Sequence, residues 1–449
     1  MRYLRKFENE TSFNAAVMSI DKSWVTLTED DKKAHFMELK KSAAWVGGGE
    51  ADCVLGGSEE YASESPVELY KTKELTEIKF PAGATELLSL DSKNLEIVDL
   101  SDCDVKAPII EQVKETVGDD VEVIVPENLN SPLIFTAKGT SSIALTNEGN
   151  RKPKLQKSMD GETWEDWDYS QINLADGESV YIKGNNPNGF SRSLSAMSYF
   201  VMTGSISCDG NVMYLLGEDI TEIPNDYCFV GLFFECTSLT NAPKLPATTL
   251  TKGCYREMFY GCTKLTSTPK LPATTLAEAC YMYMFKGCTS LTNAPKLPAT
   301  TLAKGCYNGM FWECKNLTTT GELPATTLAD MCYSGMFSTC TNLVEGPSIL
   351  PATTLTSECY SSMFASCSNL TKAPELPSPQ PLVYECYSTM FYNCSKLNYV
   401  KVGATSWNGS YTWQWLDGVA STGTFVKPSS LSIPTSIDGI PYGWTVENV

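Results

Sequence analysis

The sequence predicts a mainly β, multidomain protein. It reads as a β-sandwich followed by a seven-coil repeat solenoid, behind a small α+β N-terminal region. Two observations predict this: cysteine pairs recur every 26 or 27 residues in the C-terminal half, and short alternating apolar stretches precede them. The expected parts are an N-terminal segment (1–46), a linker (47–65), an α+β domain (66–130), a sandwich (131–217), the solenoid (218–400) and a C-terminal cap (401–449).

Composition excludes several classes of protein. With 34 basic and 53 acidic residues the formal net charge is −19, so the surface repels phosphates and we expect no nucleic-acid partner. No stretch approaches the roughly 18 apolar residues that span a bilayer, so we expect no membrane insertion. The start of the chain has charges but no apolar segment behind them, and we expect neither signal-directed export nor a membrane anchor.

The first 130 residues divide by composition. Residues 47–65 are rich in Gly, Ser and Glu, which is typical of a linker. Beyond them, KELTEIKFP, LEIVDL and VEVIVP read as strands, and PIIEQVKETV has helical spacing with Pro108 at its start. The first two strand-like pieces also fit degenerate coils of the kind that follows.

Residues 131–217 carry no repeat. Alternating stretches such as LIFTA, SIALTN and SVYIKG are separated by turn residues, which predicts an antiparallel β-sandwich. Within it, Trp164 and Trp167 lie among Glu162, Glu165, Asp166, Asp168 and Tyr169. Aromatic rings beside carboxylates suit a carbohydrate site. The alternative is core-facing Trp with solvated acids.

The repeats show nearly constant columns. Fourteen of the 17 cysteines form seven pairs, each eight residues apart: Cys228/Cys236, Cys254/Cys262, Cys280/Cys288, Cys306/Cys314, Cys332/Cys340, Cys359/Cys367 and Cys386/Cys394. Between the cysteines stand columns of Tyr, Met and Phe, and a Leu column follows. A unit of 26 residues cannot bury its own apolar face, but stacked copies can. We expect the Thr-rich and Leu-rich pieces to form short strands and CYxxMF a short helical turn.

The cysteines are predicted to be reduced and buried. Across eight helical residues the two thiols of a pair would lie roughly 12 Å apart, which is too far for a disulfide. No C-x₂-C spacing is present, so we expect no metal site.

The pattern LPATTLAxxCYxxMFxxC resembles the BspA-type leucine-rich repeat, in the form common in proteins of gut Bacteroidales and their phages. The resemblance covers roughly residues 220–400 and implies a leucine-rich-repeat solenoid. The tail from Gly423 resembles the segment that closes such arrays, and residues 131–215 resemble, less closely, the β-domain that often precedes them.

The N-terminal phrase resembles the start of many structural proteins of Bacteroidales phages. The matching residues are Tyr3, Leu4, Lys6, Phe7, Glu8, Glu29, Asp30 and Phe36. Ser23-Trp24-Val25-Thr26 departs from the family's Pro-Asn-Val-Ser. The resemblance implies a virion protein assembled in the bacterial cytoplasm, with Tyr3, Leu4 and Phe7 contacting other virion proteins.

We find no constellation that would support catalysis. His35 is the one histidine, and it stands in a charged segment. Phosphate-binding, dinucleotide-binding and zinc-protease motifs are absent from the sequence. We therefore expect no enzymatic activity and no cofactor.

The residue that follows each repeat Phe varies, so we expect this column to be exposed. Its aromatic members, Tyr260, Trp312 and Tyr392, are the first binding candidates, followed by Trp164 and Trp167. The alternative is that they pack on the next coil. The sequence thus predicts a phage fibre or spike that binds a host-surface protein or glycan. A bacterial surface or secreted adhesin is the alternative, and a glycan-active enzyme is a third. Because weak adhesive domains gain strength by multivalency, we expect a homo-oligomer, with a trimer as first choice.

Overall fold

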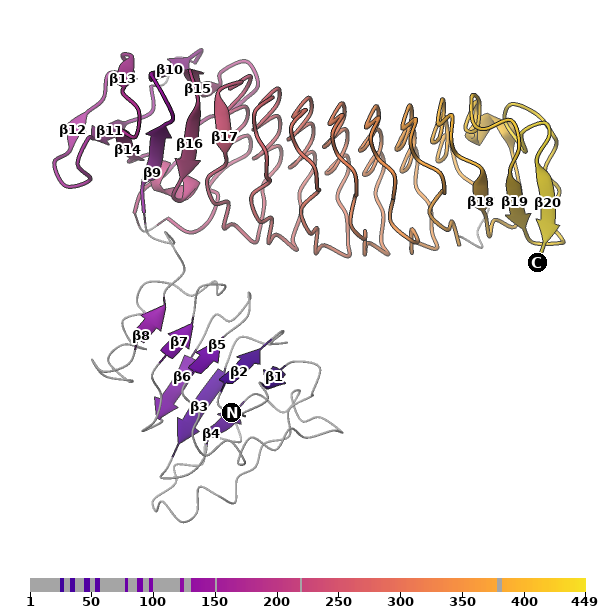
Figure 1. The fold of residues 1–449 in the computed structure, drawn as a ribbon, viewed down its shortest axis with the longest axis horizontal. Coiled ribbons are helices and arrows are strands. Elements are labelled where there is room, and N and C mark those ends of the chain that lie inside the picture. The colour runs from indigo at the N-terminus through magenta and orange to yellow at the C-terminus, as the bar shows by residue number, and fades with distance from the viewer. Residues whose placement is uncertain are drawn as a thin grey trace. The chain divides into compact units, whose positions relative to one another are not determined.

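The computed structural model separates the chain into two compact units, residues 1–130 and 131–449 (Figure 1). It describes residues 131–149, 152–218, 220–377 and 382–449, and eight strands within the first unit. The described residues form a mainly β structure whose helical turns are the short 3₁₀ segments η5 (Val212–Leu215) and η6 (Gly409–Tyr411).

The described strands of the first unit form two small sheets. A five-stranded sheet has the order β1-β2-β5-β7-β8, and its last four strands are parallel. A three-stranded sheet has the order β4-β3-β6. The strands are β1 Val25–Leu27, β2 Lys33–Phe36, β3 Ala44–Gly48, β4 Cys53–Gly56, β5 Glu77–Lys79, β6 Leu87–Asp91, β7 Ile97–Asp99 and β8 Glu122–Ile124.

Several sequence predictions fall in this unit. Strands β5, β7 and β8 lie where KELTEIKFP, LEIVDL and VEVIVP predicted strands. The predicted linker 47–65 instead contains β4, which pairs antiparallel with β3, because the apolar run CVLG interrupts the Gly- and Glu-rich composition. The assembly residues Tyr3, Leu4 and Phe7 and the helix expected after Pro108 lie outside the described residues.

The second unit begins with two sheets that share a core. A three-stranded sheet has the order β13-β10-β15, and a six-stranded sheet has the order β12-β11-β14-β9-β16-β17. Alternate side chains point inward; in β9, Leu133, Phe135 and Ala137 are buried. The Phe135 ring meets the Phe200 ring of β15 at 4.8 Å, so the two sheets pack on each other. The strands are β9 Leu133–Ala137, β10 Ser141–Asn147, β11 Leu155–Ser158, β12 Glu165–Asp166, β13 Ile172–Leu174, β14 Ser179–Gly184, β15 Ser198–Thr203, β16 Ile206–Asp209 and β17 Leu239–Asn241.

From residue 226 onward the chain forms coils that stack along one axis (Figure 1). Backbone hydrogen bonds join residues one repeat apart; for example, Tyr255 N–H donates to the Cys280 carbonyl at 3.0 Å. The Phe and Tyr columns become two ladders of parallel rings, with Phe259 and Phe285 at 5.5 Å and Tyr281 and Tyr307 at 5.8 Å. The Leu, Phe, Met, Cys and Tyr columns are buried, which confirms them as the core.

The Thr-rich pieces contact their neighbours through isolated parallel bridges, such as Thr249 with Thr275 and Thr301 with Thr327. They are therefore shorter than the strands that the sequence predicted. In the six-stranded sheet, β17 of the first coil pairs parallel with β16. The β-domain and the array consequently share one continuous core.

The array extends further than the seven predicted coils. Phe391 N–H donates to the Trp415 carbonyl at 2.9 Å, just as Phe364 N–H donates to the Met390 carbonyl. Trp415 thus occupies the Met position of an eighth coil, inside the segment expected to be only a cap. Strands β18 (Tyr399–Lys401), β19 (Thr424–Lys427) and β20 (Thr445–Asn448) then form a parallel ladder at the C-terminal end.

Candidate functional site

One side of each coil is a turn segment. In the first seven coils it has eleven residues, from two positions before the first cysteine to the second cysteine. In order, these segments are 226–236, 252–262, 278–288, 304–314, 330–340, 357–367 and 384–394, and 409–418 in the shorter eighth coil. Backbone N–H groups alternate in direction: Arg256 N–H donates to the Gly253 carbonyl of its own turn at 3.2 Å, whereas Glu257 N–H donates to Met282 of the next coil at 2.9 Å. In the segment 252–262, every backbone N–H is thereby satisfied.

This backbone is not the helical turn that the sequence predicted. Every fourth residue has a positive φ, as at Glu257 (57°), Tyr283 (56°) and Met331 (58°). A left-handed residue at this interval prevents helix propagation, since a helix needs consecutive right-handed residues. The chain becomes a ribbon in which two inward side chains alternate with two outward ones. The inward positions are the Cys, Tyr, Met and Phe columns.

The outward positions form rows along the axis, and the row after Phe contains three binding candidates. Its first four members stack on one another. Phe234 and Tyr260 stack at 4.9 Å with nearly parallel rings, and the Lys286 ammonium lies 5.4 Å from the Tyr260 ring and 4.2 Å from the Trp312 ring. One face of Trp312 therefore meets a cation from the same chain.

Tyr283 supports this group from the neighbouring row. Its ring lies 5.4 Å from the Lys286 ammonium and 6.2 Å from the Trp312 ring. A Cβ on Gly309 would lie 2.3 Å from the Tyr283 ring, so the absence of a side chain there makes room for the tyrosine. We call Tyr260, Tyr283, Lys286 and Trp312 the cation–aromatic cluster.

The expectation that the whole row after Phe is exposed is wrong. Ser338 and Ala365 are both buried, at 8% exposure, and Tyr260, Trp312 and Tyr392 are half-buried. Neighbouring coils lie so close that a small side chain in this row is covered by the coils on either side. The row therefore contributes to packing as well as to the surface.

Another outward row alternates in charge. Two positions before the first cysteine of each of the first five coils, the chain places Asp226, Lys252, Glu278, Lys304 and Asp330. Lys252 pairs with Glu278 at 3.0 Å, and Lys252 N–H donates to the Asp226 carboxylate at 3.1 Å. Opposite charges on successive coils favour the observed register.

The two tryptophan candidates of the β-domain differ in burial, and Trp167 is a core residue. It is 4% exposed, its ring stacks near Phe200 at 6.5 Å, and its indole N–H donates to the Ser170 carbonyl at 2.9 Å. Trp167 follows the two exposed residues of β12 and turns its ring into the core, which removes it from the binding candidates. Trp164 is half-buried, with the Lys183 ammonium 4.4 Å from its ring.

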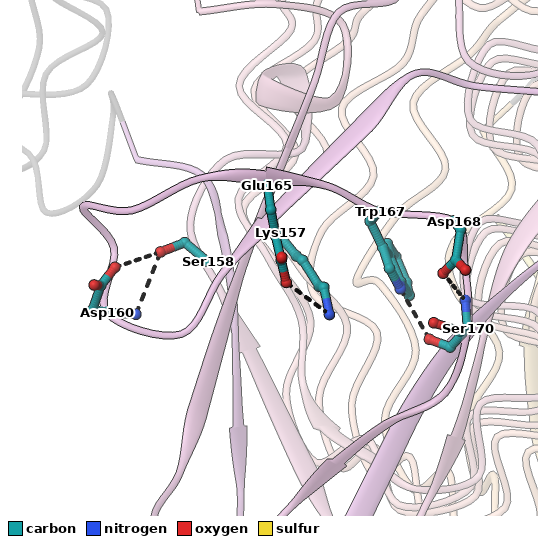
Figure 2. Close-up of polar contacts among 7 residues, drawn as sticks. All are labelled: Lys157, Ser158, Asp160, Glu165, Trp167, Asp168 and Ser170. Atoms are coloured by element: carbon teal, nitrogen blue, oxygen red, sulfur yellow. Dashed lines mark hydrogen bonds and ion pairs between the residues drawn. The ribbon is translucent and has the colours of Figure 1, made fainter.

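The acids around these tryptophans are exposed and locally bonded (Figure 2). Glu165 pairs with Lys157 at 3.1 Å, and Asp160 accepts the Ser158 hydroxyl at 2.7 Å. A backbone N–H from Thr163 holds the pKa of Asp160 well below its usual value, and hydrogen bonds from Ser170 lower that of Asp168. Catalytic acids of glycosidases need the opposite shift.

The cysteine columns have a structural use that the sequence did not reveal. From the second coil onward, the second thiol of each pair donates to the Phe carbonyl of the preceding coil, as Cys288 does to Phe259 at 3.0 Å and Cys314 to Phe285 at 3.1 Å. All fifteen cysteines of residues 131–449 that the structure describes are free and buried. Burial raises the pKa of the Cys280 thiol to about 12.

Sequence reasoning also missed the most exposed aromatics of the turn segments. Tyr384 of the seventh coil is 57% exposed and Trp413 of the eighth is 54% exposed. The recurrence of two inward and two outward residues would have placed Trp413 outside once Trp415 is aligned with the Met column. Within the described part of the chain, no group of His, Cys, Asp or Glu could hold a metal ion, and no helix is long and apolar enough to cross a membrane.

Comparison with known families agrees with this geometry. Residues 218–344 and 307–406 match the model of the BspA type leucine rich repeat region, in six copies. The matched residues are similar to BspA-type leucine-rich repeats. Searches of curated proteins and of solved structures found no match. The BspA-type repeats thus coincide with the stacked coils that present the outward rows.

Proposed function

We propose that the chain is a surface or adhesion-type protein that displays its BspA-type repeats to a binding partner. The observation that carries this proposal is the division of labour within each coil. Inward columns close the core, and the outward rows differ from coil to coil. A rigid array of this kind holds recognition groups at fixed spacing, so little conformational entropy is lost on binding. The partner is a host-surface protein or a glycan.

We further propose that the protein is not an enzyme. Asp160 and Asp168 are exposed carboxylates whose hydrogen bonds favour the ionised form, so neither suits the general acid of a glycosidase, and Trp167 beside them is buried in the core. The fluorescently labelled full chain, added to gut Bacteroidales cells, should bind saturably and release no sugar from their surface glycans. Cell binding no greater than that of an equally acidic control protein would contradict the proposal.

Whether the protein belongs to a phage particle or to a bacterial cell is a separate part of the proposal. The resemblance of the N-terminal segment favours a phage fibre or spike, joined to other virion proteins through Tyr3, Leu4 and Phe7 and present as a homo-oligomer, with a trimer expected. A bacterial surface or secreted adhesin is the alternative, since the repeats suit either. Antibodies against the chain should label purified virions and not uninfected cells. Labelling of uninfected cells alone would favour the adhesin. Light scattering that gives a monomer at micromolar concentration would contradict the trimer.

A further inference from the structure

The outward rows change character halfway along the array. In the turn segments of coils two to four, the bases are Lys252, Arg256, Lys286 and Lys304. Lys252 and Arg256 form ion pairs, each at 3.0 Å, and Lys286 lies in the cation–aromatic cluster. This half of the array meets many of its own charges with its own partners.

The turn segments of coils five to eight contain no base. Their charged residues are Asp330, Glu358, Glu385 and Asp417. Here also stand Tyr384 and Trp413, which are more than half exposed, and the half-buried Tyr392. The other outward positions are mainly small, among them Ser361, Ser362 and Thr389. We call these turn segments, 330–340, 357–367, 384–394 and 409–418, the acidic–aromatic face.

Large aromatic anchors among small hydroxyl residues are typical of recognition surfaces. Tyr and Trp offer wide contact area at a low entropic cost, and Ser and Thr offer adaptable hydrogen bonds. Because the acids here are not balanced by bases of the same segments, charge complementarity selects a cationic partner. Lys and Arg bind carboxylates through charge-assisted hydrogen bonds and bind aromatic rings through cation–π contacts.

Three lysines of the described residues already make the second kind of contact, and one of them, Lys372, lies 5.3 Å from the Tyr399 ring. Lys286 lies 4.2 Å from the Trp312 ring, and Lys183 lies 4.4 Å from the Trp164 ring. In the acidic–aromatic face the rings of Tyr384 and Trp413 are exposed to solvent. A cation from another molecule can therefore take the role that Lys286 takes within the array.

We propose that the acidic–aromatic face binds an extended basic segment of a partner protein. Its Lys or Arg side chains lie against Trp413 and Tyr384 and pair with Glu358 and Glu385. This inference rests on the proposed function, because it names the partner's chemistry for the displayed array. It places the contact on coils five to eight and away from the cation–aromatic cluster.

The test measures the anisotropy of a fluorescein-labelled twelve-residue peptide of alternating Lys and Gly, with the full chain at 150 mM salt. The parent should bind. Both Y384S/W413S and E358Q/E385Q should weaken binding at least tenfold. Y442S is the matched control, since Tyr442 is 75% exposed but lies outside the face, and it should bind like the parent. Thermal unfolding checks that each variant folds.

Three outcomes would overturn the inference. The parent could fail to bind the peptide, or both double variants could bind it like the parent, which would show attraction to the net charge alone. Third, maltoheptaose could bind in its place and lose affinity in Y384S/W413S, which would make the face a glycan site. Cell binding by the parent without peptide binding would refute this inference and leave the proposed function standing.

Discussion

The thiol of Cys236 donates a hydrogen bond to the carbonyl oxygen of Phe200 at 3.1 Å. Cys262 makes the same contact with Phe233 of the first coil, also at 3.1 Å. Phe200 belongs to β15, and its ring stacks on Phe233 at 5.4 Å. The β-domain therefore presents to the first coil the groups that each coil presents to the next, and it closes the N-terminal end of the array.

Phe200→Ala should destabilise the β-domain and the first coils together, by about 3–5 kcal/mol, because it removes a fully buried ring from both. Urea unfolding followed by tryptophan fluorescence and by hydrogen exchange of residues 228–236 would show this. Val201→Ala is the control, since Val201 is 43% exposed, and it should cost less than about 0.5 kcal/mol. Unchanged protection of residues 228–236 in Phe200→Ala would contradict the shared core.

Stability should fall steeply above about pH 8.5. Burial raises the pKa of every repeat thiol, to about 12 for Cys280 and about 11 for Cys386. Unfolded thiols ionise near pH 8.5, so their contribution to stability is complete below that pH and is lost as pH rises toward the folded values. Each thiol adds a slope of about 1.4 kcal/mol per pH unit.

Urea midpoints measured from pH 7 to 10 would check this pH dependence. A variant with Ala at Cys288, Cys314 and Cys340 should be less stable at pH 7 and show a shallower alkaline slope, because three ionising groups are removed. A flat midpoint up to pH 10 in the parent would show that the buried thiols do not control alkaline stability.

Gly309→Ala and Gly335→Ala form a matched pair. Both glycines have a positive φ, of 57° and 61°. An alanine in this left-handed conformation is destabilised by roughly 1–2 kcal/mol, so both variants should lose stability. Only at Gly309 would the new Cβ meet a ring, that of Tyr283 at 2.3 Å, whereas nothing lies within 4 Å at Gly335. Gly309→Ala should therefore lose about 1–3 kcal/mol more in chemical denaturation. Equal losses would mean that Tyr283 moves aside freely.

Met331→Gly should stabilise the array by about 0.5–1 kcal/mol. Met331 holds a φ of 58°, which glycine adopts without steric cost. The steric cost that the left-handed methionine loses exceeds the entropic cost that glycine adds. Ser334→Gly, in the same turn but without a positive φ, should instead destabilise by a similar amount. Thermal unfolding of the two variants beside the parent decides the sign. A destabilised Met331→Gly would show that the methionine side chain contributes more through packing than its backbone loses.

The inward half of each coil could be predicted from the sequence, because chemically identical residues recur at a fixed period and must stack to be buried. The turn conformation could not. Its left-handed positions hold Glu, Tyr, Met, Ser and Thr as well as Gly, so composition does not mark them. Neighbouring coils impose this conformation through their hydrogen bonds. Residue propensities describe only local preferences and do not include these contacts.

The candidate site was predicted only in part for the same reason. The sequence placed Tyr260 and Trp312 in the variable row after Phe, but their contact with Lys286 depends on which residue the neighbouring coil places beside them. Trp413 was hidden because the eighth coil shortens the period and replaces Met with Trp415. Between Trp164 and Trp167, the sequence could not show which ring faces the core.

The hydrogen bonds that join successive coils run along the axis of the array, from Phe200 N–H bonded to Leu232 to Asn393 N–H bonded to Asp417. Tension between the two ends pulls directly along these bonds, and each interface carries the full load in turn. Coils then separate one at a time. Each freed repeat of 26 residues adds up to roughly 90 Å of extended chain. An array pulled from both ends would therefore lengthen in steps, and each step would lower the force on whatever holds its ends.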